Sequence, residues 1–483
     1  MPGLIRRLLD RMDPDRLLQD TVRGFIEAQA TRHALDLDRT TWAPGTPLKL
    51  LLAGYVGSRN TGADVRVEEM IRQFRHVLGD ENLELTIMTT DPAGSAGYFR
   101  TVRQVEVPLL FPKFLFDECP RHHGVVACEG SMFKSKFSSA LTCMMAGALG
   151  MANAENKLSV GYGAEAGAMT DSLADFVRDV CRDSLVICRN EPSREVLGRL
   201  GIRTTSGTDT AWTFEPAPAE VGRRILVEHG WDGTKPILVL CPINPFWWPV
   251  RPDVVKALAH RLGGQYRREH YRSIYFHDLG PEDEEAYARY IDAYAAGARA
   301  FAERHGAFVV CVGMEKLDRT ACEDVAARLP GGAPVLVSDT FDMYELVSVL
   351  RRCTTMLSSR FHAIVTSMPG LVASAGVTMD ERIRNLMNDR GTPALFLEVD
   401  EDDLEDKVVE VLETLARERE AVADAIGRTI PVQFEKMGRM GIEFVDEVRR
   451  VYPAFEPPAR PRDPMAHLPP LSPHLRALLE QYA

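Results

Sequence analysis

The feature that most constrains the fold of this chain is a repeated alternation of solid apolar runs with helical stripes. Leu48–Ala53 is a continuous apolar run, and apolar residues at helical spacing follow it from Val67 to Leu78. Further apolar runs of the first half lie at Leu85–Met88, Val125–Cys128, Leu158–Gly161 and Leu185–Cys188. Continuous apolar strands between helices indicate a parallel sheet that is covered on both faces.

A proline-spaced polar segment at 215–220 interrupts this rhythm, which then restarts. The second half contains apolar runs at Ile237–Cys241, Ile274–Phe276, Phe308–Val312, Val335–Val337, Thr355–Leu357, Leu371–Ala375 and Ala394–Leu397, and two predicted long helices between 401 and 451. Two α/β halves joined by a short linker indicate one large cleft. In open α/β sheets ligands bind beyond the carboxyl ends of the strands, so the residues that follow each strand are the candidate site.

We divide the chain into a helical N-terminal arm (1–45), two Rossmann-like domains (46–215 and 216–455) and an extended, proline-rich C-terminal tail (456–483). The arm carries Leu17, Val22, Phe25 and Ile26 at helical spacing, which predicts packing against the first domain. A peripheral membrane contact and a homo-oligomer are the alternatives for this arm. The tail ends in a predicted helix at His474–Tyr482.

Charge and cysteine content exclude several classes of protein. The formal net charge is −12, which argues against nucleic acid as a partner, because affinity for a polyanion comes from clustered cations. Nine cysteines without CxxC spacing indicate free thiols in a reducing cytoplasm and no zinc site. The first 20 residues lack the apolar segment of a signal peptide, and the weakly polar stretch 138–154 predicts a buried helix and no membrane span.

A glycine-rich turn follows the first predicted strand, from Gly54 to Asp64. Such a turn lets backbone N–H groups approach an anion at a helix N-terminus. The Lys-Ser/Thr pair that completes a phosphate-binding loop does not follow Gly62, which excludes a nucleoside triphosphatase with such a loop. Two interpretations stay open: a tight turn with Asp64 as the helix N-cap, or a turn that contacts a ligand. The GxGxxxG spacing at 161–167 departs from the dinucleotide fingerprint.

Arginines follow predicted strands in both halves. Arg360 and His362 stand together at the expected start of a helix, where a guanidinium can hold an anion and an imidazole can exchange a proton. Arg189 and Arg382 occupy similar positions. Each arginine alone is compatible with an ordinary ion pair. Together they predict one anion site across the cleft.

Three aromatic residues lie in a proline-bracketed loop after the strand Ile237–Cys241. An aromatic face is apolar and can stack on a sugar ring, so Trp247 and Trp248 are candidates for sugar binding. The alternative is that the loop anchors itself in the core.

Taken together, these motifs resemble those of the polysaccharide pyruvyl transferase family, whose pattern opens with a GYYGxxNxGDE-type turn. The matching residues here are Gly54-Tyr55-Val56-Gly57 with Asn60-Thr61-Gly62-Ala63-Asp64, Arg189-Asn190-Glu191-Pro192-Ser193, Asp209-Thr210-Ala211-Trp212, Ser359-Arg360-Phe361-His362 and Asp380-Glu381-Arg382. The chain departs from the family where Glu129-Gly130-Ser131 replaces three glycines, where Arg382 replaces a lysine, and where Asn190 replaces an aspartate.

The resemblance implies a GT-B-like fold and transfer of pyruvate from phosphoenolpyruvate onto two hydroxyls of one sugar, which forms a cyclic ketal and releases phosphate. In this interpretation phosphoenolpyruvate is a co-substrate, and neither a cofactor nor a metal is needed. The second domain binds phosphoenolpyruvate, and the first domain binds a glycan or a lipid-linked saccharide. The expected roles are phosphoenolpyruvate binding for Arg189, Arg360 and Arg382, proton donation for His362, proton acceptance for Asp64, and acceptor binding for Tyr55, Asn60, Glu129, Trp247 and Trp248.

Two other functions fit the same sequence. A GT-B glycosyltransferase that uses a nucleotide sugar would employ the same arginine-rich cleft for a diphosphate. A non-catalytic glycan-binding or scaffold protein would account for the altered glycine turn at 129–131 and for the terminal segments.

Overall fold

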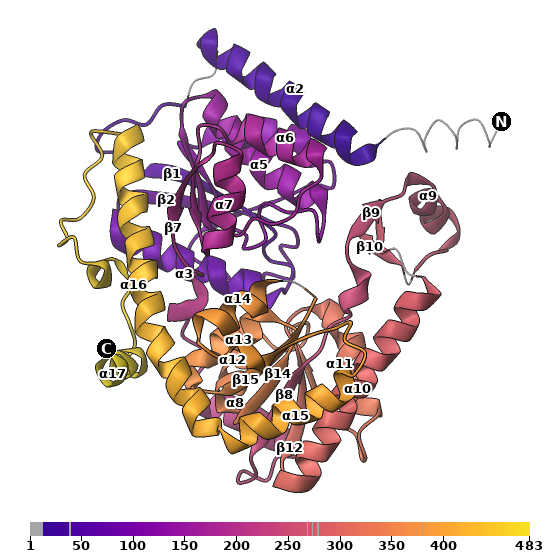
Figure 1. The fold of residues 1–483 in the computed structure, drawn as a ribbon. Helices are drawn as coiled ribbons and strands as arrows, with labels where there is room; N and C mark the ends of the chain where they lie inside the picture. Colours follow the sequence, from indigo (N-terminus) through magenta and orange to yellow (C-terminus); the bar gives the residue numbers. More distant parts are fainter. Residues whose placement is uncertain (1–12, 38–39, 268, 273, 278–279, 380) are drawn as a thin grey trace.

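The structure, a computed structural model, describes residues 13–37, 40–267, 269–272, 274–277, 280–379 and 381–483. Two α/β domains lie one against the other, and Figure 1 shows helix α16 (Arg419–Val451) running along both. Each domain contains its own parallel sheet, of seven strands in the first and six in the second. The structure therefore confirms the expected fold of two Rossmann-like domains in the GT-B arrangement.

The first sheet has the strand order β3-β2-β1-β4-β5-β6-β7, with every neighbouring pair parallel. Its strands are β1 (Leu48–Ala53), β2 (Leu83–Thr89), β3 (Arg103–Glu106), β4 (Gly124–Ala127), β5 (Leu158–Ala164), β6 (Leu185–Cys188) and β7 (Arg203–Ser206). Its helices are α3 (Thr61–Leu78), α4 (Phe111–Glu118), α5 (Ser139–Ala154), α6 (Asp171–Val180) and α7 (Glu191–Arg199). The central strands are buried along nearly their whole length, as their apolar runs predict.

The second sheet repeats this topology in the order β13-β12-β8-β14-β15-β16. Its strands are β8 (Ile237–Cys241), β12 (Phe308–Gly313), β13 (Val335–Val337), β14 (Thr355–Ser358), β15 (Ala373–Thr378) and β16 (Phe396–Glu398). The helices around it are α8 (Ala219–Glu228), α10 (Pro281–His305), α11 (Arg319–Ala327), α12 (Met343–Arg352), α13 (Phe361–Ser367), α14 (Glu381–Asp389) and α15 (Leu404–Arg417). In both sheets the chain order reverses next to the first strand, which is where open α/β sheets bind ligands.

One segment of the second half lies outside its parallel sheet. The predicted helix and strand near 254–276 form an insertion with β9 (Val250–Pro252), α9 (Val254–Gly263), β10 (His270–Arg272) and β11 (Tyr275–His277). Its three strands pair antiparallel in the order β10-β11-β9. The apolar pattern predicted a helix and a strand in this segment, but it could not show that the strand belongs to a separate antiparallel sheet.

The N-terminal arm packs on the first domain through α2 (Pro14–Ala34). Gly147 and Gly150 of α5 leave room for Val22 and Ile26 of α2, because a methyl group on either glycine would collide with them. The described part of the arm thus follows the packing interpretation. Helix α5 itself is the buried helix expected at 138–154.

The cysteines agree with the expectation of free thiols. All nine cysteines are free and buried. Among the described residues, no helix combines the length and the apolar character needed to traverse a lipid bilayer.

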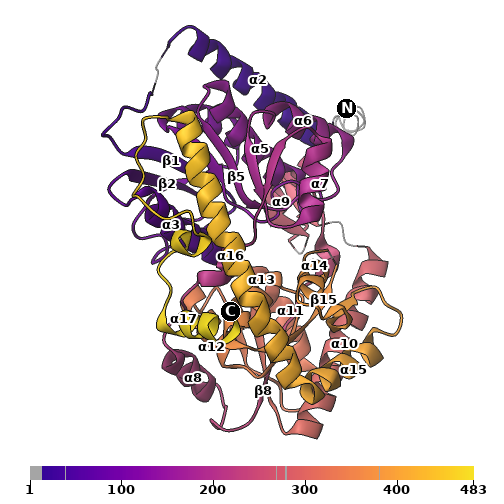
Figure 2. The same cartoon turned by 60° about the vertical axis from the view of Figure 1, so that its left-hand side comes forward.

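The last long helix and the tail connect the two domains. Helix α16 contacts α3 and β5 in the first domain and β15 in the second, and Figure 2 shows it crossing from one to the other. Pro431 lies within this helix of 33 residues. The tail then returns over α16 and ends in α17 (Pro473–Tyr482), close to the predicted helix.

Candidate functional site

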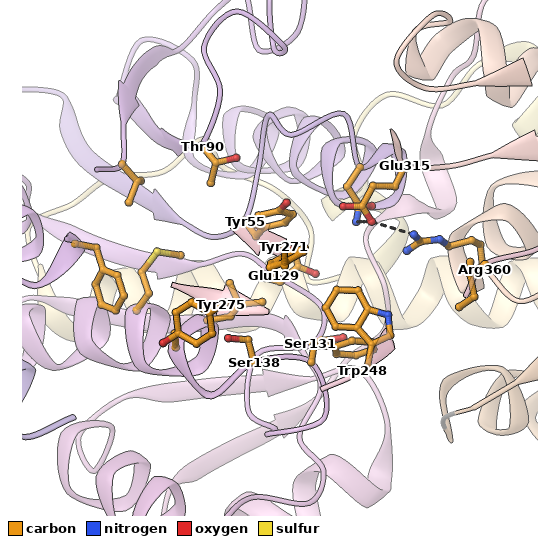
Figure 3. Close-up of a pocket in the computed structure, with 18 of the residues that line it drawn as sticks. Tyr55, Thr90, Glu129, Ser131, Ser138, Trp248, Tyr271, Tyr275, Glu315 and Arg360 are labelled. Carbon is orange, nitrogen blue, oxygen red and sulfur yellow. Dashed lines mark hydrogen bonds and ion pairs between the residues drawn. The ribbon is translucent and has the colours of Figure 1, made fainter. Parts of the chain in front are cut away.

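A cavity lies between the two domains, at the carboxyl ends of the strands where the order of each sheet reverses. Tyr55 follows β1 and Glu129 follows β4, while Ile243 follows β8 and Arg360 follows β14, and all four line the cavity. Figure 3 shows the labelled side chains spread from Thr90 and Tyr275 at one end to Glu315 and Arg360 at the other. The strand-end rule used on the sequence therefore locates the cavity correctly.

The cavity collects only part of the predicted site. Six of the ten predicted residues line it, namely Tyr55, Asn60, Glu129, Trp248, Arg360 and Arg382. The other four, Asp64, Arg189, His362 and Trp247, are not among its lining residues. Their predicted roles stay predictions.

The turn after β1 is shaped by its glycine and its polar side chains. Gly57 adopts a φ of 77°, and a methyl group there would lie 2.1 Å from Oγ1 of Thr89, so only glycine fits. The N-cap of α3 is Asn60, whose Oδ1 accepts a hydrogen bond from the backbone N–H of Ala63. Asp64 is therefore not the N-cap. Its Oδ1 instead accepts a hydrogen bond of 2.8 Å from the N–H of Gly57.

Asp64 is fully buried beneath this turn. Burial raises its pKa to about 7, and the charges of Glu129 and Glu315 add to the effect, whereas the Gly57 N–H and Arg59 oppose it. A carboxyl group with this pKa carries its proton about half of the time near neutral pH. Such a group can exchange a proton, but it has no direct opening to the cavity.

Arg360 is bound by two buried carboxylates. Its Nε donates to Oδ2 of Asp318 at 2.8 Å and its Nη2 donates to Oε2 of Glu315 at 2.9 Å. Burial lowers the pKa of Arg360, but Asp318 and Glu315 outweigh burial and raise it. Asn60 reaches the same Glu315 oxygen from the first domain, at 3.1 Å. Arg360 thus belongs to a hydrogen-bonded contact between the domains as well as to the cavity wall.

A second group of charges surrounds Asp209, and we call Arg66, Arg189, Asp209 and His362 the Asp209 cluster. Oδ2 of Asp209 lies 2.9 Å from Nε of Arg66, 2.9 Å from Nη1 of Arg189 and 3.2 Å from Nε2 of His362. Arg189 also pairs with Glu165. Burial raises the pKa of Asp209, but the neighbouring cations outweigh it and hold that pKa well below its usual range.

His362 contributes to this cluster from the second domain. Burial lowers its pKa, and Arg66 and Arg189 add to this, while Asp209 opposes them. The imidazole packs directly on Gly62 of α3, where a methyl group would lie 2.3 Å from Nδ1. The Ser-Arg-Phe-His motif and the glycine-rich turn meet at this point of the domain interface.

Arg382 of the second domain contacts the first domain, and two lysines of the first domain contact the second. Arg382 donates to Oγ of Ser131 at 3.4 Å and lies over the ring of Phe137. Lys134 lies between Glu165 and Glu381, at 3.5 and 3.2 Å, and Lys136 donates to the carbonyl of Met379. Asp380, the first residue of the predicted Asp-Glu-Arg motif, is outside the described residues.

Glu129 lines the cavity, and one oxygen of its carboxylate is buried without a partner among the residues described. Its Oε1 accepts the N–H of Gly130 at 2.8 Å, whereas its Oε2 has no hydrogen-bond partner in the part of the chain that the structure describes. A buried acceptor without a partner is costly. The sequence departure at 129–131 thus places a carboxylate where the resembling family has glycine.

Aromatic rings from the insertion form one side of the cavity. Trp248, Tyr271 and Tyr275 line it, and the ring of Trp248 lies 5.4 Å from that of Phe137 in the first domain. The N–H of Val250 also donates to the carbonyl of Phe137 at 3.1 Å. Trp247 stacks instead on His277, with ring centroids 4.9 Å apart.

The lining residues that sequence reasoning missed include Glu315, Tyr271 and Tyr275. Glu315 follows β12, so the strand-end rule could have found it. Tyr271 and Tyr275 come from the insertion, which the sequence assigned to the parallel sheet. Among the described residues, no group of histidine, cysteine, aspartate and glutamate side chains is arranged to hold a metal ion.

Comparisons with known proteins give likeness in structure alone. No family model and no curated protein matches this chain. A UDP-N-acetylglucosamine 2-epimerase from Neisseria meningitidis, bound to UDP-GlcNAc, is 10% identical over 83% of this chain and 100% of its own, with a TM-score of 0.48.

Two further solved structures give similar values. A 2-epimerase from Listeria monocytogenes, described as putative, is 10% identical over 83% of this chain and 97% of its own, with a TM-score of 0.49. Spinosyn rhamnosyltransferase SpnG is 9% identical over 83% and 100%, with a TM-score of 0.48. These values are too low to assign the chain to a family.

Proposed function

We propose that this chain is a sugar-processing transferase of the GT-B type, which binds a nucleotide sugar and a hydroxylated acceptor in the interdomain cavity. One observation carries the proposal: the carboxylate residue Glu129 and a wall of aromatic rings line the same cavity. Aromatic faces stack on sugars, and a carboxylate can accept the proton of an attacking hydroxyl.

The state of the arginines favours this donor over phosphoenolpyruvate. Arg189 already holds Glu165 and Asp209, and Arg360 already holds Glu315 and Asp318. A compact, multiply charged three-carbon ester would have to displace these carboxylates. A nucleoside diphosphate spreads two or three charges over a much larger molecule and gains affinity from stacking as well.

The proposed reaction uses the residues of the cavity as follows. Glu129 accepts the proton of the acceptor hydroxyl, whose oxygen then bonds to the anomeric carbon. The bond from that carbon to the diphosphate breaks, and the nucleoside diphosphate leaves with the electron pair. Arg382 stabilises the departing phosphate, because a guanidinium forms charge-assisted hydrogen bonds with phosphoryl oxygens.

A thermal-shift experiment tests the choice of donor. We expect UDP, GDP or thymidine diphosphate to stabilise the protein, by about 2.7 kcal/mol at a hundredfold excess over Kd. Phosphoenolpyruvate should give no shift. Stabilisation by phosphoenolpyruvate alone would refute the proposal, and no shift with any of these compounds would favour the non-catalytic alternative.

Glu129→Gln tests the proposed base with the nucleotide sugar whose nucleotide gives the shift. Release of nucleotide should fall by about 10²-fold or more, while the thermal shift is retained. Glu191→Gln, at an exposed glutamate outside the cavity, is the matched control and should leave both unchanged.

Pyruvyl transfer is the second candidate, and one observation favours it. Arg189 and Arg382 line a smaller neighbouring cavity together with Asp209 and Phe361. Burial, with repulsion from Arg66 and Arg382, lowers the pKa of Arg189 to about 10 against the attraction of Asp209. An anion between the two guanidinium groups would relieve this repulsion. This candidate requires acceptor-dependent phosphate release from phosphoenolpyruvate, and its loss in His362→Ala.

A further inference from the structure

The interdomain cavity has two chemically different ends. Glu315 and Arg360 mark the polar end, and Thr90 and Tyr275 lie toward the other end in Figure 3. The N–H of Val107 donates to the carbonyl of Thr89 at 2.9 Å, so the chain after β3 passes beside Thr90. That chain and the start of α5 supply the walls of the second end. These walls, which we call the apolar compartment, consist of Val107, Pro108, Leu109, Phe111, Leu141 and Met144.

The apolar compartment leads from the interior to the surface. Val107, Phe111 and Met144 are buried, whereas Leu109 is 60% exposed. Leu110, the next residue, is 83% exposed. Two neighbouring leucines held in water at the edge of a cavity are typical of a surface that an apolar ligand covers.

The chemistry of the walls selects between two kinds of occupant. A nucleobase carries donors and acceptors along its edge, and burying them without partners costs free energy. The compartment's side chains are aliphatic, thioether or phenyl, and Pro108 also lacks a backbone N–H donor. The hydroxyls of Thr90 and Tyr275 at the same end already donate to Val56 and Asp15. An alkyl chain needs no such partners. The apolar compartment therefore fits an alkyl chain better than the base of the donor.

We infer that the acceptor is amphipathic, with a hydroxylated head beside Glu129 and an alkyl chain that fills the apolar compartment and leaves over Leu109. The two ends belong to one continuous cavity, so one molecule with both characters can occupy both. This inference rests on the proposed function only for the role of the head as acceptor. The binding of the chain is a separate property.

A series of alkyl β-D-glucosides tests the inference on the full chain. Methyl, butyl, hexyl and octyl glucoside are titrated below their micelle concentrations, and binding is followed by calorimetry. Each methylene buried in the compartment should tighten binding about fourfold until the chain reaches the surface. Equal affinities along the series, or no binding of octyl glucoside, would overturn the inference.

Variants locate the bound chain. Leu109→Ser, at an exposed position that folding does not require, should weaken octyl glucoside about fivefold and leave methyl glucoside unchanged. Leu141→Ser should act in the same direction. Leu262→Ser removes a leucine of α9 that is even more exposed and is not among the cavity's lining residues, and it should have no effect. A loss of octyl glucoside binding in Leu262→Ser, or equal weakening of both glucosides in Leu109→Ser, would place the chain elsewhere and overturn the inference.

The same titrations separate this inference from the proposed function. If the protein binds octyl glucoside through Leu109 but shows no thermal shift with any nucleoside diphosphate, the amphipathic ligand is supported and the nucleotide donor is refuted. If the protein binds a nucleoside diphosphate but binds all alkyl glucosides with equal affinity, the donor is supported and the alkyl-chain site is refuted.

Discussion

The cavity and the Asp209 cluster each contain residues that the sequence predicts to bind a ligand, but they differ in how their charges are satisfied. In the Asp209 cluster, a single carboxylate holds two arginines and a histidine, with Oδ2 at 2.9 to 3.2 Å from each. In the cavity, Glu129 keeps an oxygen without a partner among the described residues. A conspicuous cation at a strand end can therefore serve the domain interface, and its position alone does not identify a ligand site.

Removal of Asp209 gives the largest expected effect on this comparison. Asp209→Ala leaves Arg66 and Arg189 buried without their shared carboxylate, which should lower the free energy of unfolding by about 4 kcal/mol. Denaturant unfolding measures it. Asp179→Ala removes an exposed aspartate paired with Arg23 and should change stability by less than about 0.5 kcal/mol. Similar small losses in both variants would show that the cluster does not hold the domains together.

Arg360 and Arg382 both line the cavity, but we expect Arg360 to stabilise the domain interface and Arg382 to bind the ligand. Arg360→Ala leaves the buried carboxylates of Glu315 and Asp318 without their guanidinium partner and should lower the free energy of unfolding by about 2 kcal/mol. Arg382→Ala, which removes contacts to Ser131 and Phe137, should cost less than about 1 kcal/mol but weaken nucleoside diphosphate binding about tenfold. Unfolding and calorimetry together give both quantities. The reverse pattern would assign the structural role to Arg382.

Gly62 tests how closely the two domains are fitted at His362. Gly62→Ala should destabilise the protein by about 1.5 kcal/mol, because the new methyl group overlaps the imidazole. Gly198→Ala, in α7 with open space around it, should be neutral or stabilising. In the double variant Gly62→Ala, His362→Ala, the cost of the methyl group should largely disappear. Additive effects in that double variant would contradict the contact.

Asp64 gives the smallest effect, and it appears in the pH dependence. The pKa of Asp64 is about 7 in the folded chain and about 3.8 in the unfolded chain, so the folded state binds more protons between these values. Its contribution to stability is present below the unfolded pKa and is lost as pH rises through 7. Between pH 6 and 8 the free energy of unfolding should fall by about 1.4 kcal/mol more in the natural chain than in Asp64→Asn. Parallel pH profiles would show that Asp64 is ionised throughout.

The sequence predicted the sheets well because their signal is local. The apolar runs at Leu48–Ala53 and Ile237–Cys241 mark strands whose faces are both covered. The insertion was assigned to the wrong sheet because a three-residue strand has the same apolar pattern in any sheet. Its aromatic residues Tyr271 and Tyr275 were missed for that reason.

The strand ends that meet at the cavity could be predicted from the sequence, but the pairing of charges around them could not. The strand-end rule brings Tyr55, Glu129 and Arg360 to one cavity. The rule cannot say which cation meets a carboxylate from a distant segment. Arg360 and Glu315 are 45 residues apart, and Asp209 and His362 are 153 residues apart. Such pairings follow from tertiary packing, which periodicity and spacing do not encode.

Helix α16 has a mechanical consequence for any domain motion. The helix is a rod of about 50 Å fastened to both sheets on the same side of the molecule. Sliding of the two domains along the helix would break its apolar contacts with them. A rotation of one domain relative to the other, which bends the helix, costs less. Pro431 leaves one backbone carbonyl of the helix without its donor, and bending is cheapest at such a residue. Relative motion of the two domains should therefore bend α16 at Pro431.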